Sequence, residues 1–286
     1  MTTAFVKVVP DHLSVGIHRV AKALAAAAPA YKVEIVDDAV NADLVVQHVI
    51  GWGSLEGWAI KPGQKRAVIQ YCLRTTEDPS PTRWAEEWKQ AALVASYYDL
   101  AAYAPGHAFA FYHAPLGADA SVFKPDPIPR ALFQCVTSGY VADTESAGEV
   151  AEAARRVQGR VFHLGPDLGL GKHVWALRGI SDSLLAELYA GSRYVSGLRR
   201  IEGFELPAVE GLLCGARPIM FDTPDYRTWF DGFASFVPEC PPAELVEHLV
   251  KLFQSRLDPM DPGVRRQAVN RFSWDAFAGG FWERVL

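Results

Sequence analysis

The sequence predicts an α/β protein of two domains, each with a doubly wound parallel sheet. Short β-branched runs alternate with stretches of helical apolar spacing, which is typical of parallel sheets. Three prolines fall within residues 123–130, and such a stretch excludes helix and favours an interdomain linker. The alternation starts again beyond it. We therefore expect a first domain over residues 1–124, a second over 125–270 and a final segment over 271–286.

The first domain opens with a β-branched run over 5–9, which predicts a strand. Apolar residues from Ile17 to Leu24 follow at helical spacing. Residues 91–96 fit either a helix end or a short strand. Further strands are predicted over 32–36, 43–49 and 67–71.

The second domain repeats this order, with a strand over 132–136 and a helix over 145–157. Ser273 is expected to cap a last, aromatic-rich helix. The remaining predicted elements are strands over 160–164, 174–177 and 194–196 and helices over 182–190 and 245–253.

Composition limits the classes of function. Of the 286 residues, 50% are hydrophobic and the formal net charge is -5, which argues against an overall electrostatic footprint for nucleic acid. The four cysteines form no C-x-x-C pair, which favours a reduced, cytoplasmic setting. No window approaches the roughly 20 apolar residues of a membrane span. We expect a soluble protein whose membrane contact, if any, is peripheral.

Residues 200–215 carry the strongest candidate site. Glu202 and Glu210 flank a glycine turn that leads into a helix beginning Leu206-Pro207. Backbone N–H groups at a helix start can hold a diphosphate, and carboxylates accept hydrogen bonds from sugar hydroxyls. In a plainer interpretation both glutamates are solvated surface residues. The glycine and apolar strand at 215–221 place the motif inside an α/β repeat, where sites lie at strand-to-helix turns.

Residues 202–219, EGFELPAVEGLLCGARPI, resemble the E-G-F-G-L-P-x-x-E signature of retaining GT-B glycosyltransferases, the glycogen-synthase-like group of glycosyltransferase family 4. Residues 112–125 and 174–190 resemble two further segments of that group, in the same order. Residues 15–24 resemble its first loop and helix, and 272–275 the opening of its last helix. The resemblance implies two Rossmann-like domains facing across a cleft, with a C-terminal helix that returns to the first.

The resemblance also implies roles for the matched residues. Glu202 would contact the donor sugar and Glu210 the ribose, while the N–H groups after Glu202 would hold the sugar and diphosphate. Arg178 and Gly179 would border the nucleobase, and Gly16 would let the first loop approach the phosphates. The full set of expected donor-binding residues is Gly16, Ser138, Gly139, Arg178, Gly179, Gly203, Phe204, Glu205, Leu206 and Glu210.

The chain departs from the family pattern in its charges. The family's G-R-x-x-x-x-K-G element, whose cations neutralise the diphosphate, corresponds to residues 137–147, which contain neither cation. Glu205 stands where the family usually has glycine. Cations that could substitute are Arg74, Lys172, Arg178, Arg199 and Arg200, although each also reads as a solvated surface group.

A second departure concerns the family histidine over the donor sugar, whose place is taken by Tyr71 or Cys72. His48 and His113 are the alternatives, and either can equally be structural. We predict Glu202, His48 and Arg200 as the catalytic residues.

The resemblance implies transfer of a sugar from a UDP-, GDP- or ADP-linked donor to an acceptor hydroxyl, with retention of configuration. No metal and no cofactor beyond the nucleotide sugar is expected. The acceptor is open between a saccharide, a lipid-linked sugar and a modified nucleic-acid base. Because the family cations are missing, the alternative is a GT-B nucleotide-sugar binding protein that has lost catalysis. A sugar-nucleotide epimerase is a third possibility.

Overall fold

The chain forms two compact units in a computed structural model that describes residues 1–8, 15–55, 61–73, 80–125, 132–139, 142–200, 203–255 and 261–286. The first unit holds the described residues of Met1–Gly117 and Ile201–Gly203 together with Trp274–Leu286. The second holds those of Ala118–Arg200 and Phe204–Ser273. The predicted proline-rich linker lies outside the described residues from 126 onward.

The first unit contains a six-stranded sheet in the order β2-β1-β3-β4-β5-β6, with every pairing parallel. All six residues of β3 are buried, as expected for a strand covered on both faces. The strands are β1 (Thr2–Phe5), β2 (Val33–Ile35), β3 (Leu44–Val49), β4 (Lys65–Gln70), β5 (Leu93–Ser96) and β6 (Phe111–His113). The helices are α1 (Val15–Ala27), α2 (Pro81–Trp88), α3 (Leu100–Tyr103) and α11 (Trp274–Val285), with short 3-10 turns η1 (Ala28–Tyr31), η2 (Ala39–Asn41) and η3 (Trp52–Leu55).

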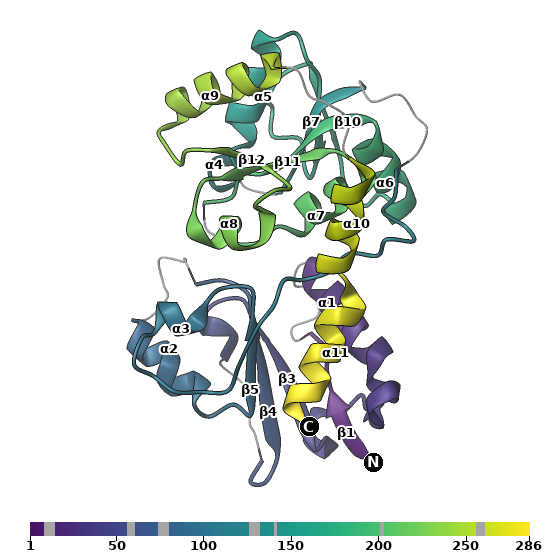
Figure 1. The fold of residues 1–286 in the computed structure, drawn as a ribbon, viewed down its shortest axis with the longest axis vertical. Helices are drawn as coiled ribbons and strands as arrows, with labels where there is room; N and C mark the ends of the chain where they lie inside the picture. Colours follow the sequence, from purple (N-terminus) through teal and green to yellow (C-terminus); the bar gives the residue numbers. More distant parts are fainter. Residues whose placement is uncertain are drawn as a thin grey trace. The chain divides into compact units, whose positions relative to one another are not determined.

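The last helix of the chain, α11, packs beside α1 (Figure 1). The fully buried Trp282 donates its indole N–H to the Leu24 carbonyl at 2.9 Å. On the opposite side of the helix the Tyr112 hydroxyl donates to the Ala276 carbonyl at 3.2 Å, and its ring stacks on Phe277. The C-terminal segment is thus part of the first unit, as expected.

The second unit contains another six-stranded parallel sheet, in the order β12-β11-β10-β7-β8-β9. Its strands are β7 (Phe133–Ser138), β8 (Val161–Leu164), β9 (Val174–Leu177), β10 (Ser192–Gly197), β11 (Arg217–Phe221) and β12 (Ser235–Val237). Its helices are α4 (Ala142–Glu145), α5 (Ala147–Arg156), α6 (Asp182–Ala190), α7 (Leu206–Cys214), α8 (Pro224–Phe230), α9 (Pro242–Gln254) and α10 (Pro262–Arg271).

Helix α7 lies very close to its sheet. A Cβ added at Gly211 would stand 2.6 Å from the Val195 Cγ1 of β10, so only glycine permits this approach. The helix ends at Gly215, whose φ of 92° is the left-handed conformation that glycine adopts readily. Below its start, Phe204 packs on Phe230 and Phe272. These contacts fix the position from which α7 begins.

The two parallel sheets confirm the predicted α/β class, with local differences. The first strand covers Thr2–Phe5 instead of 5–9, because the Asp43 carboxylate accepts hydrogen bonds from the N–H and hydroxyl of Thr3 and ties this polar segment to β3. The ambiguous segment 91–96 is the strand β5. The three-residue edge strands β6 and β12 were not predicted.

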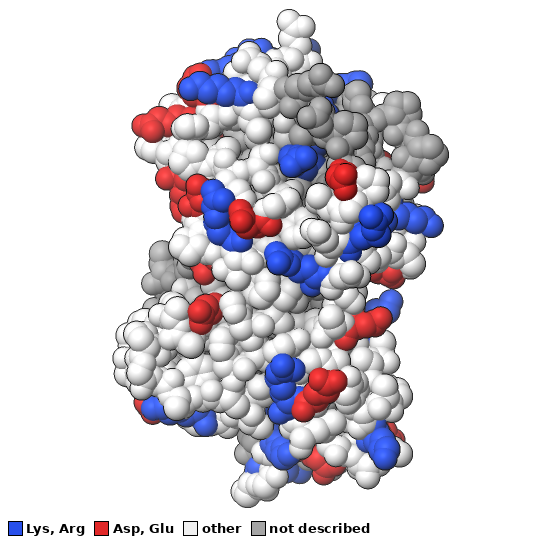
Figure 2. All heavy atoms as spheres, viewed as in Figure 1, with Lys and Arg blue, Asp and Glu red and all other residues white. Residues whose placement is uncertain are grey.

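On the face shown in Figure 2, basic and acidic side chains are interspersed, and the described residues of that face form no large area of one sign. In the part of the chain that the structure describes, no helix is long and apolar enough to cross a membrane.

Candidate functional site

In the sheet of the second unit, the strands that follow β7 in the sequence are added first on one side of it and then on the other. From β7 the strand order runs outward through β8 and β9, and β10 then pairs on the other side of β7. Segments that follow β7 and β10 leave the same sheet edge on either side of this switch point, where open α/β sheets bind their ligands. Ser138 and Gly139 follow the first strand, and Phe204–Leu206 follows the second. The fold therefore brings these predicted donor-binding residues to one edge.

The backbone of Gly139 lies in contact with the carboxylate of Glu145. Its φ is 133°, and a Cβ added there would overlap the Glu145 carboxylate. Gly139 donates its N–H to the Leu164 carbonyl at 3.0 Å, which holds the loop against β8. The glycine is needed because a buried carboxylate, 8% exposed, lies directly against its Cα.

Arg199 joins the two loops of the switch point. Its Nη2 lies 3.3 Å from the Glu145 Oε1, and its Nε lies 3.1 Å from the Glu205 Oε1. Glu205 is only 3% exposed. The next residue, Arg200, donates its backbone N–H to the Thr144 carbonyl at 3.0 Å. One guanidinium between two buried carboxylates leaves this cluster of Glu145, Arg199 and Glu205 with a formal charge of about -1.

Helix α7 starts at this cluster without a side-chain cap. Glu205 occupies the N-cap position in an extended conformation, and its side chain makes no capping hydrogen bond. The first N–H groups of a helix have no partner inside the helix and can bind an anion. Gly203 and Phe204, which precede this start, are buried. Glu210, one turn in, is 3% exposed, so the solvated interpretation of this residue is wrong.

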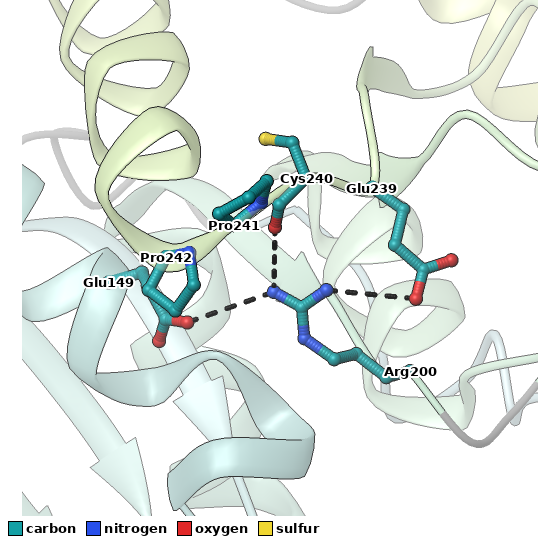
Figure 3. A pocket seen from close by; sticks show the side chains of 6 residues that line it. All are labelled: Glu149, Arg200, Glu239, Cys240, Pro241 and Pro242. Atoms are coloured by element: carbon teal, nitrogen blue, oxygen red, sulfur yellow. Dashed lines mark hydrogen bonds and ion pairs between the residues drawn. The ribbon is translucent and has the colours of Figure 1, made fainter.

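Arg200 points to a different set of groups, shown in Figure 3. Its Nη2 donates to the Cys240 carbonyl at 3.2 Å, and Glu149 and Glu239 lie 3.8 and 3.6 Å from the guanidinium. These residues, with Pro241 and Pro242 at the start of α9, line a cavity of about 410 Å³. Arg200 thus ties the loop after β10 to α5 and α9, and none of these contacts involves the Arg199 cluster.

Arg178 and Gly179 follow β9 at the same sheet edge. Arg178 is exposed, and Gly179 has a φ of 68° with open space around its Cα. The left-handed backbone conformation at position 179 therefore favours glycine, whereas the space around it would admit a side chain. Two strand spacings, about 10 Å, separate β9 from β7.

His48 is buried in β3 of the first unit, 2% exposed. Its Nε2 lies 3.1 Å from the Val6 carbonyl and its Nδ1 lies 2.7 Å from the Tyr71 hydroxyl. Burial lowers the pKa of His48 to about 4, so the ring is neutral near pH 7. His113 contacts the Tyr97 carbonyl through Nε2 at 3.1 Å. His48 and His113 thus each contact residues that follow neighbouring strands of the first sheet.

Two predicted residues lie in or near segments outside the described residues. Glu202 lies outside the described residues. Gly16 is the second residue of α1, two positions after the segment 9–14. Among the described residues, no group of three or more His, Cys, Asp or Glu side chains is arranged to hold a metal ion.

Sequence reasoning missed Glu145 and His163. His163 of β8 is 1% exposed, and its Nδ1 lies 2.8 Å from the Thr137 hydroxyl. Burial lowers the pKa of His163, and a hydrogen bond with the Gly139 backbone partly offsets this shift. A glutamate in a short helix and a histidine in a strand carry no pattern of their own. The one available signal for Glu145 was its place in the segment that replaces the family's cationic element.

The sequence matches no family model, and a search of curated proteins finds no match either. Solved structures match over nearly the whole chain. AviGT4, a glycosyltransferase involved in avilamycin A biosynthesis, matches with a TM-score of 0.67 and 15% identity, covering 100% of this chain and 97% of that one. Sucrose-phosphate synthase from Thermosynechococcus elongatus matches with a TM-score of 0.70 and 14% identity, covering 98% and 97%.

HepE of Anabaena, whose structure was solved in complex with UDP and glucose, also has a TM-score of 0.70 and 14% identity, covering 99% of this chain and 98% of that one. At such identities the likeness concerns the fold. With two parallel six-stranded sheets flanked by helices, this chain has the GT-B fold of the glycosyltransferases.

Proposed function

We propose that this protein transfers a sugar from a nucleotide diphosphate sugar to an acceptor hydroxyl, with retention of configuration and without a metal ion. The observation that carries the proposal is the start of α7, which lies at the switch point of the second sheet, without a side-chain cap and one turn before the buried Glu210. A helix start in this position suits a diphosphate. The complex of HepE with UDP and glucose supports the same ligand class.

The donor would lie along the carboxyl edge of the second sheet. In this proposal the N–H groups of Gly203–Leu206 bind the diphosphate and sugar, Glu210 accepts hydrogen bonds from the ribose, and Glu202 accepts them from the transferred sugar. The base would reach Arg178 and Gly179. The separation of about 10 Å between β7 and β9 suits a nucleoside extended along the edge. Ser138 and Gly139 would face the donor from the loop after β7.

We propose different roles for two of the three residues that the sequence predicted as catalytic. His48 has both ring nitrogens in contact with protein groups, so we propose that it holds β3 to its neighbours instead of touching the donor. Arg200 is held by Cys240, Glu149 and Glu239. We therefore propose the adjacent Arg199 as the cation closest to the diphosphate, because it lies between the two loops of the switch point.

A second candidate function is nucleotide-sugar binding without turnover. It is favoured by the charges of the Arg199 cluster, in which two carboxylates offset one guanidinium. Catalysis of diphosphate departure depends largely on stabilising the developing negative charge. A site with this balance stabilises that charge less than one with two free cations.

The donor is tested first by thermal shift across UDP-, GDP- and ADP-linked sugars. Binding to the folded state alone raises its stability by RT ln(1 + [L]/Kd), so one nucleotide class should raise Tm in a concentration-dependent way. The donor so identified is then used in assays of transfer to saccharide, lipid-linked and nucleic-acid acceptors. If no nucleotide sugar raises Tm, the proposal is wrong.

Turnover is tested with Glu202→Ala, and with the exposed Glu187→Ala of α6 as the matched control. We expect the Glu202 variant to lose nucleotide release and sugar transfer while the control keeps both. NMR of the product should show the donor's anomeric configuration, and a chelator should leave the rate unchanged. Product made without any acceptor would indicate the epimerase. Donor binding with no nucleotide release from the unsubstituted protein would establish the binding protein instead.

A further inference from the structure

The Arg199 cluster has the opposite charge balance to the one that a diphosphate site requires. Its members come from three segments that meet at the switch point: Glu145 ends α4, Arg199 follows β10, and Glu205 precedes α7. Both carboxylates are at least nine-tenths buried, whereas the Arg199 side chain keeps 23% of its surface exposed. The guanidinium is therefore the member of the cluster that is most accessible from outside.

The position of Glu145 is fixed by the backbone around it. Its carboxylate lies against the Cα of Gly139, where any side chain would overlap it. The Gly139 loop is held in turn by the hydrogen bond to Leu164. The Gly139 loop therefore limits the positions open to the Glu145 carboxylate, which contributes to the electrostatic field at the site together with Glu205.

His163 packs against the same loop. Burial lowers the pKa of His163, and a hydrogen bond with the Gly139 backbone partly offsets this shift. A Cβ on Gly165 would lie 2.7 Å from the His163 Nε2 and would also overlap the Gly139 carbonyl. His163 thus stands directly behind the Gly139 loop, with Thr137 fixing its Nδ1 at 2.8 Å. The Gly139 backbone and the Thr137 hydroxyl thus satisfy this buried ring.

We propose that Glu145 and Glu205 determine ligand selectivity at this site: they hold Arg199 toward the diphosphate of the donor and, by their charge, weaken the binding of the free nucleoside diphosphate. This inference rests on the proposed function. The β-phosphate of a nucleotide sugar is bonded to both the sugar and the α-phosphate and carries one negative charge, whereas the terminal phosphate of the free nucleoside diphosphate ionises a second time near neutral pH. Buried carboxylates therefore oppose the product more strongly than the donor, and product release is favoured.

The proposal predicts an increase in affinity on removing a charge. Glu145→Gln and Glu205→Gln keep the size of each side chain and raise the cluster's formal charge to about zero. We expect each variant to bind the nucleoside diphosphate about tenfold more tightly and the nucleotide sugar only about threefold more tightly, with both gains smaller at high salt. Arg199→Gln should weaken both ligands about tenfold, and Arg199→Lys should weaken them less, because lysine keeps the charge and loses the fork of donors.

The experiment is isothermal titration of the full chain and its variants with UDP and UDP-glucose, GDP and GDP-mannose, and ADP and ADP-glucose. Glu187→Gln on the exposed face of α6 is the control for loss of a negative charge elsewhere. Circular dichroism checks that each variant is folded. Glu145 and Glu205 lie on different segments, so the loss of fold in one variant leaves the other as the test.

The outcomes separate this inference from the function on which it rests. Tighter diphosphate binding by a folded Glu145→Gln or Glu205→Gln variant, with donor binding changed less, supports the inference. If the unsubstituted protein binds the nucleotides and both variants bind the diphosphate equally or more weakly, the carboxylates only scaffold Arg199 and the inference is wrong. If neither the unsubstituted protein nor any folded variant binds a nucleotide, the proposed function fails as well.

Discussion

The two sheets have the same number of strands and the same parallel pairing, yet the described residues at the carboxyl ends of β4 and β5 differ in charge from those at β7 and β10. In the first unit, the ends of β4 and β5 carry neutral groups that satisfy one another. Gln70 donates to the Cys72 carbonyl and accepts from the Trp88 indole, and Ser96 donates to the Gln70 carbonyl. In the second unit the corresponding edge carries the Arg199 cluster and Glu210.

The difference shows that topology places a site and the loops decide its chemistry. Neutral groups that satisfy one another stabilise the first sheet at the ends of β4 and β5. Buried charges at the second edge are costly to maintain without a partner of matching chemistry. Substitutions of Trp88 and His48 in the first unit and of Gly139 in the second test this difference.

The largest effect is expected from Trp88→Ala in the first unit. Trp88 is fully buried, stacks on Trp84 and donates to Gln70 at 3.3 Å. Its removal leaves a cavity and an unsatisfied amide, so the free energy of unfolding should fall by about 3–5 kcal/mol. Urea denaturation measures this loss. A loss similar to that of an exposed substitution such as Lys89→Ala would show that the neutral network adds nothing to stability.

His48 should make stability depend on pH. Its pKa in the folded protein, about 4, lies below the ordinary value of 6.5 because of burial. The unfolded chain therefore binds a proton between these values that the folded protein does not. The contribution is complete above pH 6.5 and is lost as pH falls toward 4, by up to about 3 kcal/mol.

Urea denaturation of the His48→Gln variant across this pH range checks the slope. The variant should show a flatter pH dependence of the free energy of unfolding, whatever its absolute stability. The exposed Gln90→Ala, which removes no titrating group, serves as the control and should keep the slope of the unsubstituted protein. An unchanged slope in the His48 variant would contradict the assignment of a neutral, buried ring.

Gly139→Ala tests the charged edge with a smaller effect on stability. The added Cβ overlaps the Glu145 carboxylate, and the φ of 133° is strained for alanine. Displacement of the loop should cost about 1–3 kcal/mol and should also reduce nucleotide binding. Gly232→Ala is a matched control, since Gly232 has a φ of 80° but open space. If both variants bind nucleotide equally, the contact between Gly139 and Glu145 does not shape the site.

The sequence predicted the parts of the fold that depend on local pattern. The helix start at Leu206-Pro207 and the glycine that ends α7 follow from first-turn proline and left-handed glycine preferences. The three-residue strands β6 and β12 escaped prediction because pairing with a neighbour, and not their own residues, makes them strands.

The site was predictable only in part, because its ion pairs join distant segments. Glu145 and Arg199 lie far apart in the sequence, and nothing in either segment indicates that the loops after β7 and β10 meet. The choice between Arg199 and Arg200 depends on the direction of two adjacent side chains. Likewise, the burial of His48 depends on Val6 and Tyr71, which other strands supply.

The hydrogen bond between Trp282 and Leu24 has a consequence for the order of events during synthesis. The first unit is not a continuous stretch of chain, because α11 completes its packing beside α1. Domains generally fold as their residues emerge from the ribosome. The surface of α1 that receives α11 must therefore wait, exposed, until the whole of the second unit has been made. The unit that is synthesised first is the one that finishes folding last.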